Sequence, residues 1–272
     1  MRIAACLKWV DLRPEVDLVT GHVRTHVRSS GWSAADRAAV EVALRLGAVW
    51  DGTVTVVCAG PAEAEPALRE LVAAGAARAV RIDAPADAES PAVASVLAEV
   101  LDGHDVVLCG DYSLDRGSGS VPAFLAHDLG AAQALGLIAL DPAEAGRVLT
   151  TRRLGGGRAE RLEVTAPMVL SVEGSLAQLR RAPLTNTLEA LDVQVEVVPA
   201  APSAPGTTLH GVSALRPRAR VMPAPHGDHA RDRILALTGA LVDHVPPRTI
   251  EATPDEAADE ILAQLRTWGY LP

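Results

Sequence analysis

The sequence has very few aromatic residues: Phe, Tyr and Trp together make up only 3% of its 272 residues. Single-stranded nucleic acids bind on stacked aromatic side chains, so this composition offers little from which to build such a site. Positive charge is also scarce, because 25 Lys and Arg stand against 34 Asp and Glu and leave a net charge of -9. Proteins that bind nucleic acid through its phosphates have the opposite balance. The composition therefore argues against nucleic acid as a partner.

Cysteine is sparse and long hydrophobic runs are absent. Cys6, Cys58 and Cys109 are odd in number and far apart, which is not the pattern of a disulfide framework. We expect them to be small buried residues at strand ends and expect no metal site, because the spacing does not suit one. No apolar run reaches the roughly 18 residues of a membrane helix, and no targeting segment is evident. A soluble cytoplasmic protein that does not insert into membranes is the simplest interpretation.

The sequence is rich in hydrophobic residues, at 49%, and they follow an alternating pattern over the first 140 residues. Short apolar runs typical of buried parallel strands alternate there with amphipathic stretches typical of helices. This alternation predicts right-handed βαβ crossovers and one doubly wound, mostly parallel α/β sheet. We expect strands at 2–8, 53–59, 78–84, 105–110 and 135–140, and helices at 33–48, 63–76, 90–102 and 120–130.

The pattern changes after residue 140, where hairpin, linker and helix signals follow one another. Residues 200–229 are rich in Pro, Ala, Gly, Ser and His and predict an extended linker. We therefore divide the chain into an α/β domain at 1–199, the linker, and a C-terminal helical arm at 230–272. The elements expected after residue 140 are a hairpin at 147–164, strands at 166–174 and 192–199, and helices at 230–245 and 253–269.

Three of these helices have recognisable capping signals at their starts. Ser33 with Asp36 three positions later forms a capping-box pattern. Ser90 is expected to cap the helix at 90–102, because Pro91 suits the first helical position. Thr253 with Glu256 gives the last helix a second capping box.

A polar loop of about ten residues, longer than most βα connections, joins the strand at 105–110 to the helix at 120–130. Small residues that lead into a helix offer backbone N–H groups to an anion. The loop has neither the Walker A pattern nor the dinucleotide fingerprint, so two interpretations stay open. It is a helix-capping turn, or a ligand site at the carboxyl end of a parallel strand. In the second case Asp115 would accept from a ribose hydroxyl and Arg116 would bind a phosphate.

No catalytic constellation is visible in the sequence. It has no Gly-x-Ser-x-Gly elbow, no His-Glu-x-x-His and no carboxylate pair set by periodicity, so we expect no catalysis by side chains. A basic interval stands out in this acidic chain, and it is either a solvated hairpin face or a docking surface for an anionic ligand or an acidic partner. Its members are Arg152, Arg153, Arg158, Arg161, Arg180 and Arg181.

Taken in order, these segments resemble the β subunit of electron transfer flavoproteins. The stretch "CLKWV" with Lys8 is similar to the end of the family's first strand, and "SAADRAAVEVALRL" (33–46) to its first helix. The loop "GDYSLDRGSGS" (110–120) resembles the family's Gly-Lys-Gln-x-Ile-Asp-Gly-Asp-Thr-Gly-Gln. Residues 152–190 resemble its Gly-Gly hairpin, the next strand and a recognition loop. The resemblance covers about residues 1–195 in unbroken order.

The resemblance implies a fold, a function and a set of cofactor-binding residues. The fold is an adenine-nucleotide α-hydrolase-like, Rossmann-like sheet whose first strand neighbours its fourth, with an added β-hairpin and a C-terminal arm of helices that wraps the α subunit. The function is to bind AMP or a second FAD, to help the α subunit hold FAD at the heterodimer interface, and to pass electrons from dehydrogenases to an acceptor. The cofactor-binding residues implied are Cys6, Lys8, Ser33, Ala34, Ala35, Asp36, Ala59, Gly110, Asp111, Ser113, Leu114, Asp115, Arg116, Gly117, Ser118 and Gly119.

The resemblance also places a docking loop for dehydrogenases near residues 177–190, with Leu184 as its anchor and Arg180 and Arg181 beside it. The sequence departs from the family pattern where Asn-Pro-Phe becomes "SAA" (33–35), the loop lysine becomes Asp111 and an acidic loop residue becomes Arg116. Asp111 would repel a phosphate and Arg116 would restore the attraction. These departures suggest a divergent branch, and our working hypothesis is the branch associated with the mycofactocin redox cofactor.

Two rival functions remain open at this point. One is a stand-alone adenine-nucleotide-binding protein or enzyme of the universal-stress or PP-loop type. The hairpin and loop after residue 147 count against it, because those folds stop near the fifth strand. The other is a structural partner that has lost its nucleotide.

Overall fold

The computed structural model describes residues 1–85, 88–200, 210–211, 213, 224–225, 227–238 and 249–271. The chain divides into two compact units, Met1–Leu215 and Arg216–Pro272. The predicted linker at 200–229 lies mostly outside the described residues, and the predicted division at 199 and 229 stays a prediction. In the second unit α6 spans Ala230–Thr238 and α7 spans Pro254–Thr267. The rest of the helix predicted at 230–245 lies outside the described residues.

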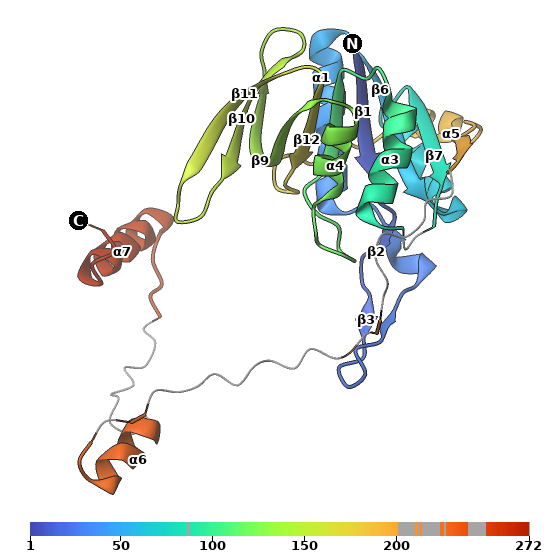
Figure 1. Ribbon diagram of the computed structural model, residues 1–272. Coiled ribbons are helices and arrows are strands. Elements are labelled where there is room, and N and C mark those ends of the chain that lie inside the picture. The colour runs from blue at the N-terminus through green and yellow to red at the C-terminus, as the bar shows by residue number, and fades with distance from the viewer. Residues whose placement is uncertain are drawn as a thin grey trace. The chain divides into compact units, whose positions relative to one another are not determined.

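Among the described residues, the first unit has one nine-stranded sheet in the order β11-β10-β9-β12-β8-β1-β6-β7-β13 (Figure 1). The seven neighbouring strands β9-β12-β8-β1-β6-β7-β13 are all paired in parallel. Strand β10 is antiparallel to both of its neighbours, β9 and β11. The predicted doubly wound, mostly parallel sheet is therefore confirmed. The strands are β1 (Arg2–Leu7), β6 (Thr53–Gly60), β7 (Arg78–Asp83), β8 (Val106–Gly110), β9 (Ala132–Pro142), β10 (Arg147–Arg153), β11 (Ala159–Thr165), β12 (Met168–Val172) and β13 (Glu196–Pro199).

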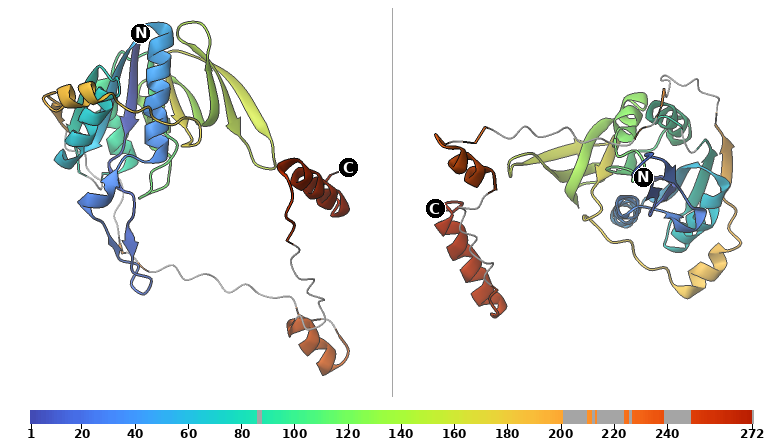
Figure 2. Two further views of the ribbon diagram at one scale, coloured as in Figure 1. Left: turned by 180° about the vertical axis from the view of Figure 1, so that it is seen from behind. Right: turned by 90° about the horizontal axis from the view of Figure 1, so that it is seen from below.

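Helices cover both faces of this sheet (Figures 1 and 2). One face carries α1 (Ala34–Trp50) and α2 (Glu65–Ala73), which pack into the larger hydrophobic cluster. The opposite face carries α3 (Ser90–Leu101) and α4 (Val121–Asp128), which pack into the second cluster. A short helix, α5 (Leu184–Ala190), lies in the segment predicted as a docking loop, where the sequence had not predicted a helix.

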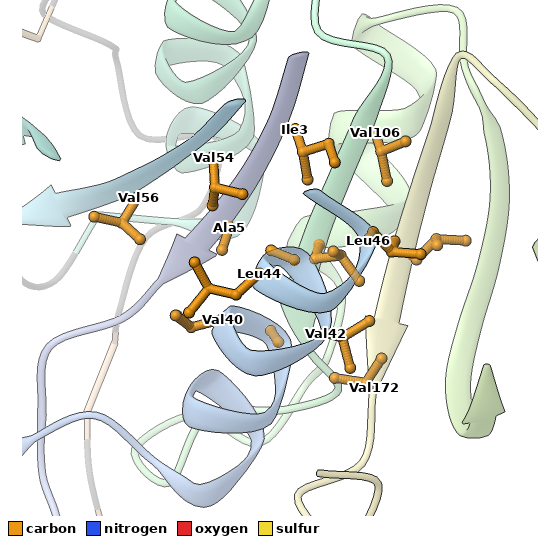
Figure 3. Packing of buried hydrophobic residues seen from close by; sticks show 14 of the residues in the cluster. Ile3, Ala5, Val40, Val42, Leu44, Leu46, Val54, Val56, Val106 and Val172 are labelled. Carbon is orange, nitrogen blue, oxygen red and sulfur yellow. The ribbon is translucent and has the colours of Figure 1, made fainter. Parts of the chain in front are cut away.

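Strand β1 shows how the sequence produces two cores. Ile3, Ala5 and Leu7 belong to the cluster beneath α1, whereas Ala4 and Cys6 belong to the cluster beneath α3 and α4. Successive side chains of a strand point to opposite faces, so an uninterrupted apolar run suits a strand covered on both sides. Figure 3 shows the α1 side of this arrangement, where labelled side chains of the helix pack against those of β1, β6, β8 and β12.

The chain order of the strands creates a switch point beside β1. β6 and β7 follow β1 on one side of it, and β8 then pairs with β1 on the other side. The resemblance implied this adjacency of the first and fourth predicted strands, and the structure confirms it. Open α/β sheets bind ligands at the carboxyl ends of the strands at such a point.

Strand β9 differs from the prediction of a parallel strand buried on both faces. It pairs in parallel with β12 but antiparallel with β10, and of its eleven residues only Ala134 and Leu137 are fully buried. Its inner residues join the core while its ends are open to solvent. The apolar run thus predicted a strand correctly. Which strands pair with it, and in which direction, depends on the hairpin that follows.

Two of the three predicted caps are confirmed and one is wrong. The capping boxes at Ser33 and at Thr253 both form, each with the carboxylate three residues on. Ser90 is instead the first helical residue, and the N-cap of α3 is Glu89. Pro91 is therefore the second residue of α3. Proline fits this position, because the backbone N–H groups of the first helical turn have no partner within the helix and none is lost.

An excursion between β1 and α1 was not foreseen from the sequence. It contains two small antiparallel ladders and a 3-10 turn, and it is held together by Asp11, whose carboxylate accepts from the backbone N–H groups of Arg13 and His26. Its elements are β2 (Val10–Asp11), β3 (Glu15–Val16), β4 (Val23–Arg24), η1 (Val27–Ser29) and β5 (Ser30–Gly31).

We predict that Leu108→Ala destabilises the chain by about 2–5 kcal/mol, because it opens a cavity in the central strand β8 where the side chain is fully buried. Urea unfolding followed by circular dichroism measures the loss. Leu149→Ala is the matched control, because that leucine is 50% exposed at the surface of β10. Equal losses for the two variants would contradict the core described here.

Candidate functional site

An open cleft lies at the carboxyl ends of β1, β6 and β8. The starts of α3 and α4 and the loop before α4 form its other walls. Its position is therefore the switch point of the sheet. The lining residues are Cys6, Leu7, Lys8, Asp36, Ala59, Pro85, Ala88, Ser90, Val93, Leu97, Cys109, Gly110, Tyr112, Ser113, Arg116, Ser118, Gly119, Ser120, Val121 and Pro122.

The start of α1 approaches the ends of β8 and β12 very closely, and glycine stands at both contacts. A Cβ atom on Gly110 would lie 3.0 Å from the Cβ of Ala35 and 3.2 Å from the backbone nitrogen of Asp36. A Cβ on Gly174 would lie 2.8 Å from the Cβ of Ala34. Small residues on both sides therefore set how near α1 comes to the floor of the cleft.

Asp36 combines a structural role with a place in the cleft wall. Its Oδ2 accepts from the Ser33 N–H at 3.1 Å and from the Ser33 hydroxyl at 2.7 Å, which completes the capping box. Burial raises the pKa of Asp36 to about 6, although the hydrogen bonds from Ser33 and the charge of Lys8 oppose the rise. This carboxyl group is therefore only half ionised near pH 6.

The loop from 111 to 120 is held by backbone contacts at its start and within it. The Asp111 N–H donates to the Val172 carbonyl at 3.1 Å, and the Gly117 N–H donates to the Ser113 carbonyl at 2.8 Å. Gly119 has a φ of 59°, and a Cβ there would lie 2.4 Å from the Asp111 carbonyl oxygen. Only glycine fits this position without moving the backbone.

A side-chain ion pair ties the same loop to β1. Lys8 Nζ lies 2.6 Å from Asp115 Oδ2, with both side chains about one third exposed. Burial raises the pKa of Asp115, but the hydrogen bonds from Lys8 and Ser113 and the charge of Lys8 outweigh it, so the pKa is lowered overall. The pair fixes the loop over the end of β1 and neutralises part of the positive charge of Lys8.

Asp111 does not line the cleft, although we expected it to repel a phosphate there. Its Oδ1 is buried and has no hydrogen-bond partner among the described residues. Burial raises the pKa of this carboxyl, and the nearby charge of Glu173 adds to the rise.

The structure brings together nine of the sixteen predicted cofactor residues in the cleft wall and leaves seven out. Ser33, Ala34 and Ala35 belong to the start of α1 and support the wall from behind. The others that do not line it are loop residues. The nine that line the cleft are Cys6, Lys8, Asp36, Ala59, Gly110, Ser113, Arg116, Ser118 and Gly119, and the four remaining loop residues outside it are Asp111, Leu114, Asp115 and Gly117.

Sequence reasoning missed the wall formed by α3 and the start of α4. Ser90, Val93 and Leu97 of α3 line the cleft, as do Cys109 and Tyr112. The signal was present, because helices that follow neighbouring parallel strands begin at the same edge of the sheet. The predicted helices at 90–102 and 120–130 therefore both pointed to this edge.

Much of the basic interval is paired inside the chain. Arg152 pairs with Glu160, and Arg153 lies 3.1 Å from Glu173. Arg180 donates to the buried Glu41 carboxylate of α1 from its backbone N–H and from both Nε and Nη2, at 3.0 to 3.1 Å. Burial raises the pKa of Glu41, but these hydrogen bonds lower it overall. Arg180 thereby fixes the segment that leads to α5.

The predicted anchor, Leu184, is 74% exposed at the first position of α5. Leu188 and Leu191 are 57% and 67% exposed. Residues four and seven positions apart lie on one side of a helix, so these leucines form one apolar strip.

The described part of the chain contains neither a metal-binding cluster nor a membrane-spanning helix. No group of three or more His, Cys, Asp or Glu side chains there could hold a metal ion. No helix in the same ranges has both the length and the apolar character needed to cross a membrane.

Comparison with known proteins gives a consistent result. The family model for the electron transfer flavoprotein domain matches residues 20–203. FixA of Rhizobium meliloti is 29% identical over 209 residues, which cover 72% of this chain and 71% of the relative. The electron transfer flavoprotein subunit beta of Syntrophomonas wolfei is 28% identical over 207 residues, 74% of this chain and 81% of the relative. The electron transfer flavoprotein subunit beta of Bradyrhizobium diazoefficiens is 32% identical over 158 residues. These residues cover 57% of this chain and 63% of the relative, which is less than two thirds of the relative's length.

The sheet order and the cleft define a doubly wound α/β protein with a ligand-type site at its switch point. The matches to known proteins identify the family within this class. The chain belongs to the electron transfer flavoprotein family, on the β-subunit side of it, as the resemblance had indicated.

We compare the free energy of unfolding of the wild type with that of Asp36→Asn. We predict that the wild-type value, taken relative to the variant, falls by up to about 3 kcal/mol between pH 4 and pH 7. The raised pKa means that the folded state keeps its proton after the unfolded chain has ionised near pH 4. This contribution is present at low pH and is lost as the pH rises through about 6. Urea unfolding at intervals of one pH unit measures it.

Asp192→Asn is the matched control for this experiment, because Asp192 is exposed. Its difference from wild type should stay nearly constant over the same range. A pH-independent difference for Asp36→Asn would show that the carboxyl is already ionised in the fold.

Proposed function

We propose that this chain is a nucleotide-binding electron-transfer subunit that holds the phosphate of AMP or of an FAD in the cleft. The observation that carries the proposal is the meeting of the glycine-containing loop and the starts of α3 and α4 at the switch point. Helix starts and such loops present backbone N–H groups, which bind phosphate without a Walker motif. This role requires binding and orientation and no bond-making chemistry by side chains.

The loop has the backbone geometry expected of a phosphate cradle. Gly119 has a positive φ and Ser120 follows it in the right-handed helical region, an alternation that forms anion-binding concavities. Arg116 and Lys8 line the cleft and supply positive charge, and the hydroxyl groups of Ser118 and Ser120 are further donors. Asp111 adds no charge to the wall. These features support the nine predicted residues that line the cleft as the surroundings of the nucleotide.

The proposed partner is an electron transfer flavoprotein α subunit. The names of the matching relatives, which call them β subunits, support this partner. In the resulting heterodimer the α subunit holds FAD and this chain contributes to its surroundings, so electrons pass from a dehydrogenase through the flavin to an acceptor. Flavin supplies the electron chemistry, and the protein supplies binding and orientation. We place the complex in the cytoplasm and keep the mycofactocin association as a prediction.

The dehydrogenase is proposed to dock on the apolar strip of Leu184, Leu188 and Leu191. Exposed leucines on a short helix can insert into a pocket of a partner. The buried Glu41–Arg180 contact supports this role, because it fixes the chain just before the strip. In this arrangement Arg180 acts by holding the loop in place, while Arg181 stays available beside it.

The proposal is tested by co-expression of the full chain with an α subunit from the same organism. We expect a yellow one-to-one complex that releases FAD, and mass spectrometry of the released ligands identifies the nucleotide held by this chain. A colourless chain that binds ATP alone and no α subunit would support the stand-alone alternative instead.

The cleft itself is tested by Gly119→Ala. We expect AMP affinity to fall by roughly tenfold or more, because the new Cβ would lie 2.4 Å from the Asp111 carbonyl oxygen and displace the cradle. Isothermal titration calorimetry measures the affinity. Gly155→Ala is the matched control, because a Cβ there meets nothing within 4 Å. Unchanged affinity in Gly119→Ala would remove the loop from the site.

For the docking strip we predict that Leu184→Ala weakens reduction of the complex by its dehydrogenase at low concentrations. Truncation of a central interface leucine costs about 1–2 kcal/mol of binding, so the effect should appear in KM and leave the flavin content unchanged. Val49→Ala serves as the control, because Val49 is equally apolar and 59% exposed on α1. An unchanged KM would exclude the strip.

A further inference from the structure

Two of the three cysteines stand directly opposite each other at the switch point. Cys6 of β1 and Cys109 of β8 are register partners in the parallel pairing of these strands. The third, Cys58 of β6, is the register partner of Leu7, so it belongs to the opposite face of the sheet. All three are buried and free.

The two opposed thiols also share one environment. Cys6 and Cys109 belong to the hydrophobic cluster beneath α3 and α4, and both line the cleft. They are 6% and 5% exposed, and the neighbouring Cys109 thiol raises the pKa of Cys6. Cys58 is fully buried beneath α1 and does not line the cleft. The cleft is therefore the route by which a small molecule reaches Cys6 and Cys109.

We propose that Cys6 and Cys109 form an oxidisable dithiol on the floor of the cleft, whose conversion to a disulfide weakens nucleotide binding there. In-register strands of a sheet lie about 4.7–4.9 Å apart. This spacing is within the roughly 4.4–6.8 Å between Cα atoms that a disulfide accepts. Because in-register side chains of parallel strands point the same way, the two Cβ atoms lie at about the strand spacing, slightly beyond the roughly 3.5–4.5 Å that a disulfide accepts. Joining the two sulfur atoms therefore draws the strands together by a few tenths of an ångström.

The oxidant is hydrogen peroxide, which is small enough to enter the cleft. One thiol, as its thiolate, attacks a peroxide oxygen, so the O–O bond breaks and a sulfenic acid and hydroxide form. The second sulfur then attacks the sulfenic sulfur, and the S–O bond breaks as the S–S bond forms. In total two S–H bonds are lost, one S–S bond is made and one peroxide becomes two waters. Burial and Cys109 raise the pKa of the Cys6 thiol, so the reaction accelerates as the pH rises.

Disulfide formation changes the cleft at its most constrained point. It brings the two sulfur atoms to about 2.05 Å from each other. Both lie at the carboxyl ends of β1 and β8, next to Lys8 and to the loop that begins after Gly110. This part of the inference rests on the proposed function, since it assumes that a nucleotide occupies the cleft. A bound nucleotide should in turn cover the thiols and slow their oxidation.

The test uses the full-length chain, treated with hydrogen peroxide and then alkylated in denaturant with iodoacetamide. Trypsin places the three cysteines on separate peptides, 3–8, 46–69 and 82–116. We expect a reducible cross-link between 3–8 and 82–116, lighter by two hydrogen atoms than the two free peptides together. The peptide 46–69, which carries Cys58, should remain fully alkylated and serves as the internal control. A cross-link that includes Cys58, or none, would overturn the proposal.

The effect on binding is measured by calorimetry with AMP on the same samples. Oxidation should weaken AMP binding by roughly tenfold, and dithiothreitol should restore it. In Cys109→Ser the affinity should not respond to peroxide, whereas Cys58→Ala should behave as wild type. A mapped Cys6–Cys109 disulfide with unchanged affinity would overturn the switch. If the reduced chain binds neither AMP nor FAD, the proposed nucleotide site fails, while the cross-link still decides the dithiol.

Discussion

The parallel pairing of β1 with β8 is the constraint on which the rest of the structure depends. It places a strand from the beginning of the chain beside one that begins more than a hundred residues later, and the two run in register from Ile3 and Val106 to Cys6 and Cys109. After β1 the chain continues to β6 and β7 on one side of it and then returns to β8 on its other side. The helices that follow these strands therefore diverge where β1 and β8 meet. The gap they leave is the cleft. Its floor, its glycine at position 110 and its paired thiols all result from this one register.

The cleft owes its character more to backbone geometry than to net charge. Lys8 is engaged by Asp115, and Asp36 gives up part of its negative charge because its pKa is raised to about 6. What remains is a nearly balanced set of charges beside oriented N–H groups. Such a site distinguishes a phosphate by the direction of its donors, and it suits a ligand that is held and not cleaved.

Much of the fold was predictable from local pattern, because the determinants are local. The apolar run at 105–110, the capping box of Ser33 with Asp36 and the glycine turn of the hairpin each identify their element within a few residues. The direction of the pairing of β9 was not, since it depends on where the hairpin and β12 lie in space. The α3 wall of the cleft was missed for the same kind of reason. Ser90 was interpreted as a cap of its own helix, and only the sheet order brings it opposite the loop.

The contact of α1 with Gly110 and Gly174 has a consequence for recognising distant relatives. What the structure requires at positions 34 and 35 is small volume against two glycines, preceded by a side chain that caps the helix. Ser33, Ala34 and Ala35 meet that requirement although they share no residue with the family's Asn-Pro-Phe. A search that demands those three letters would pass over such chains. One that asks for a cap, two small residues and glycines at the ends of two later strands would find them.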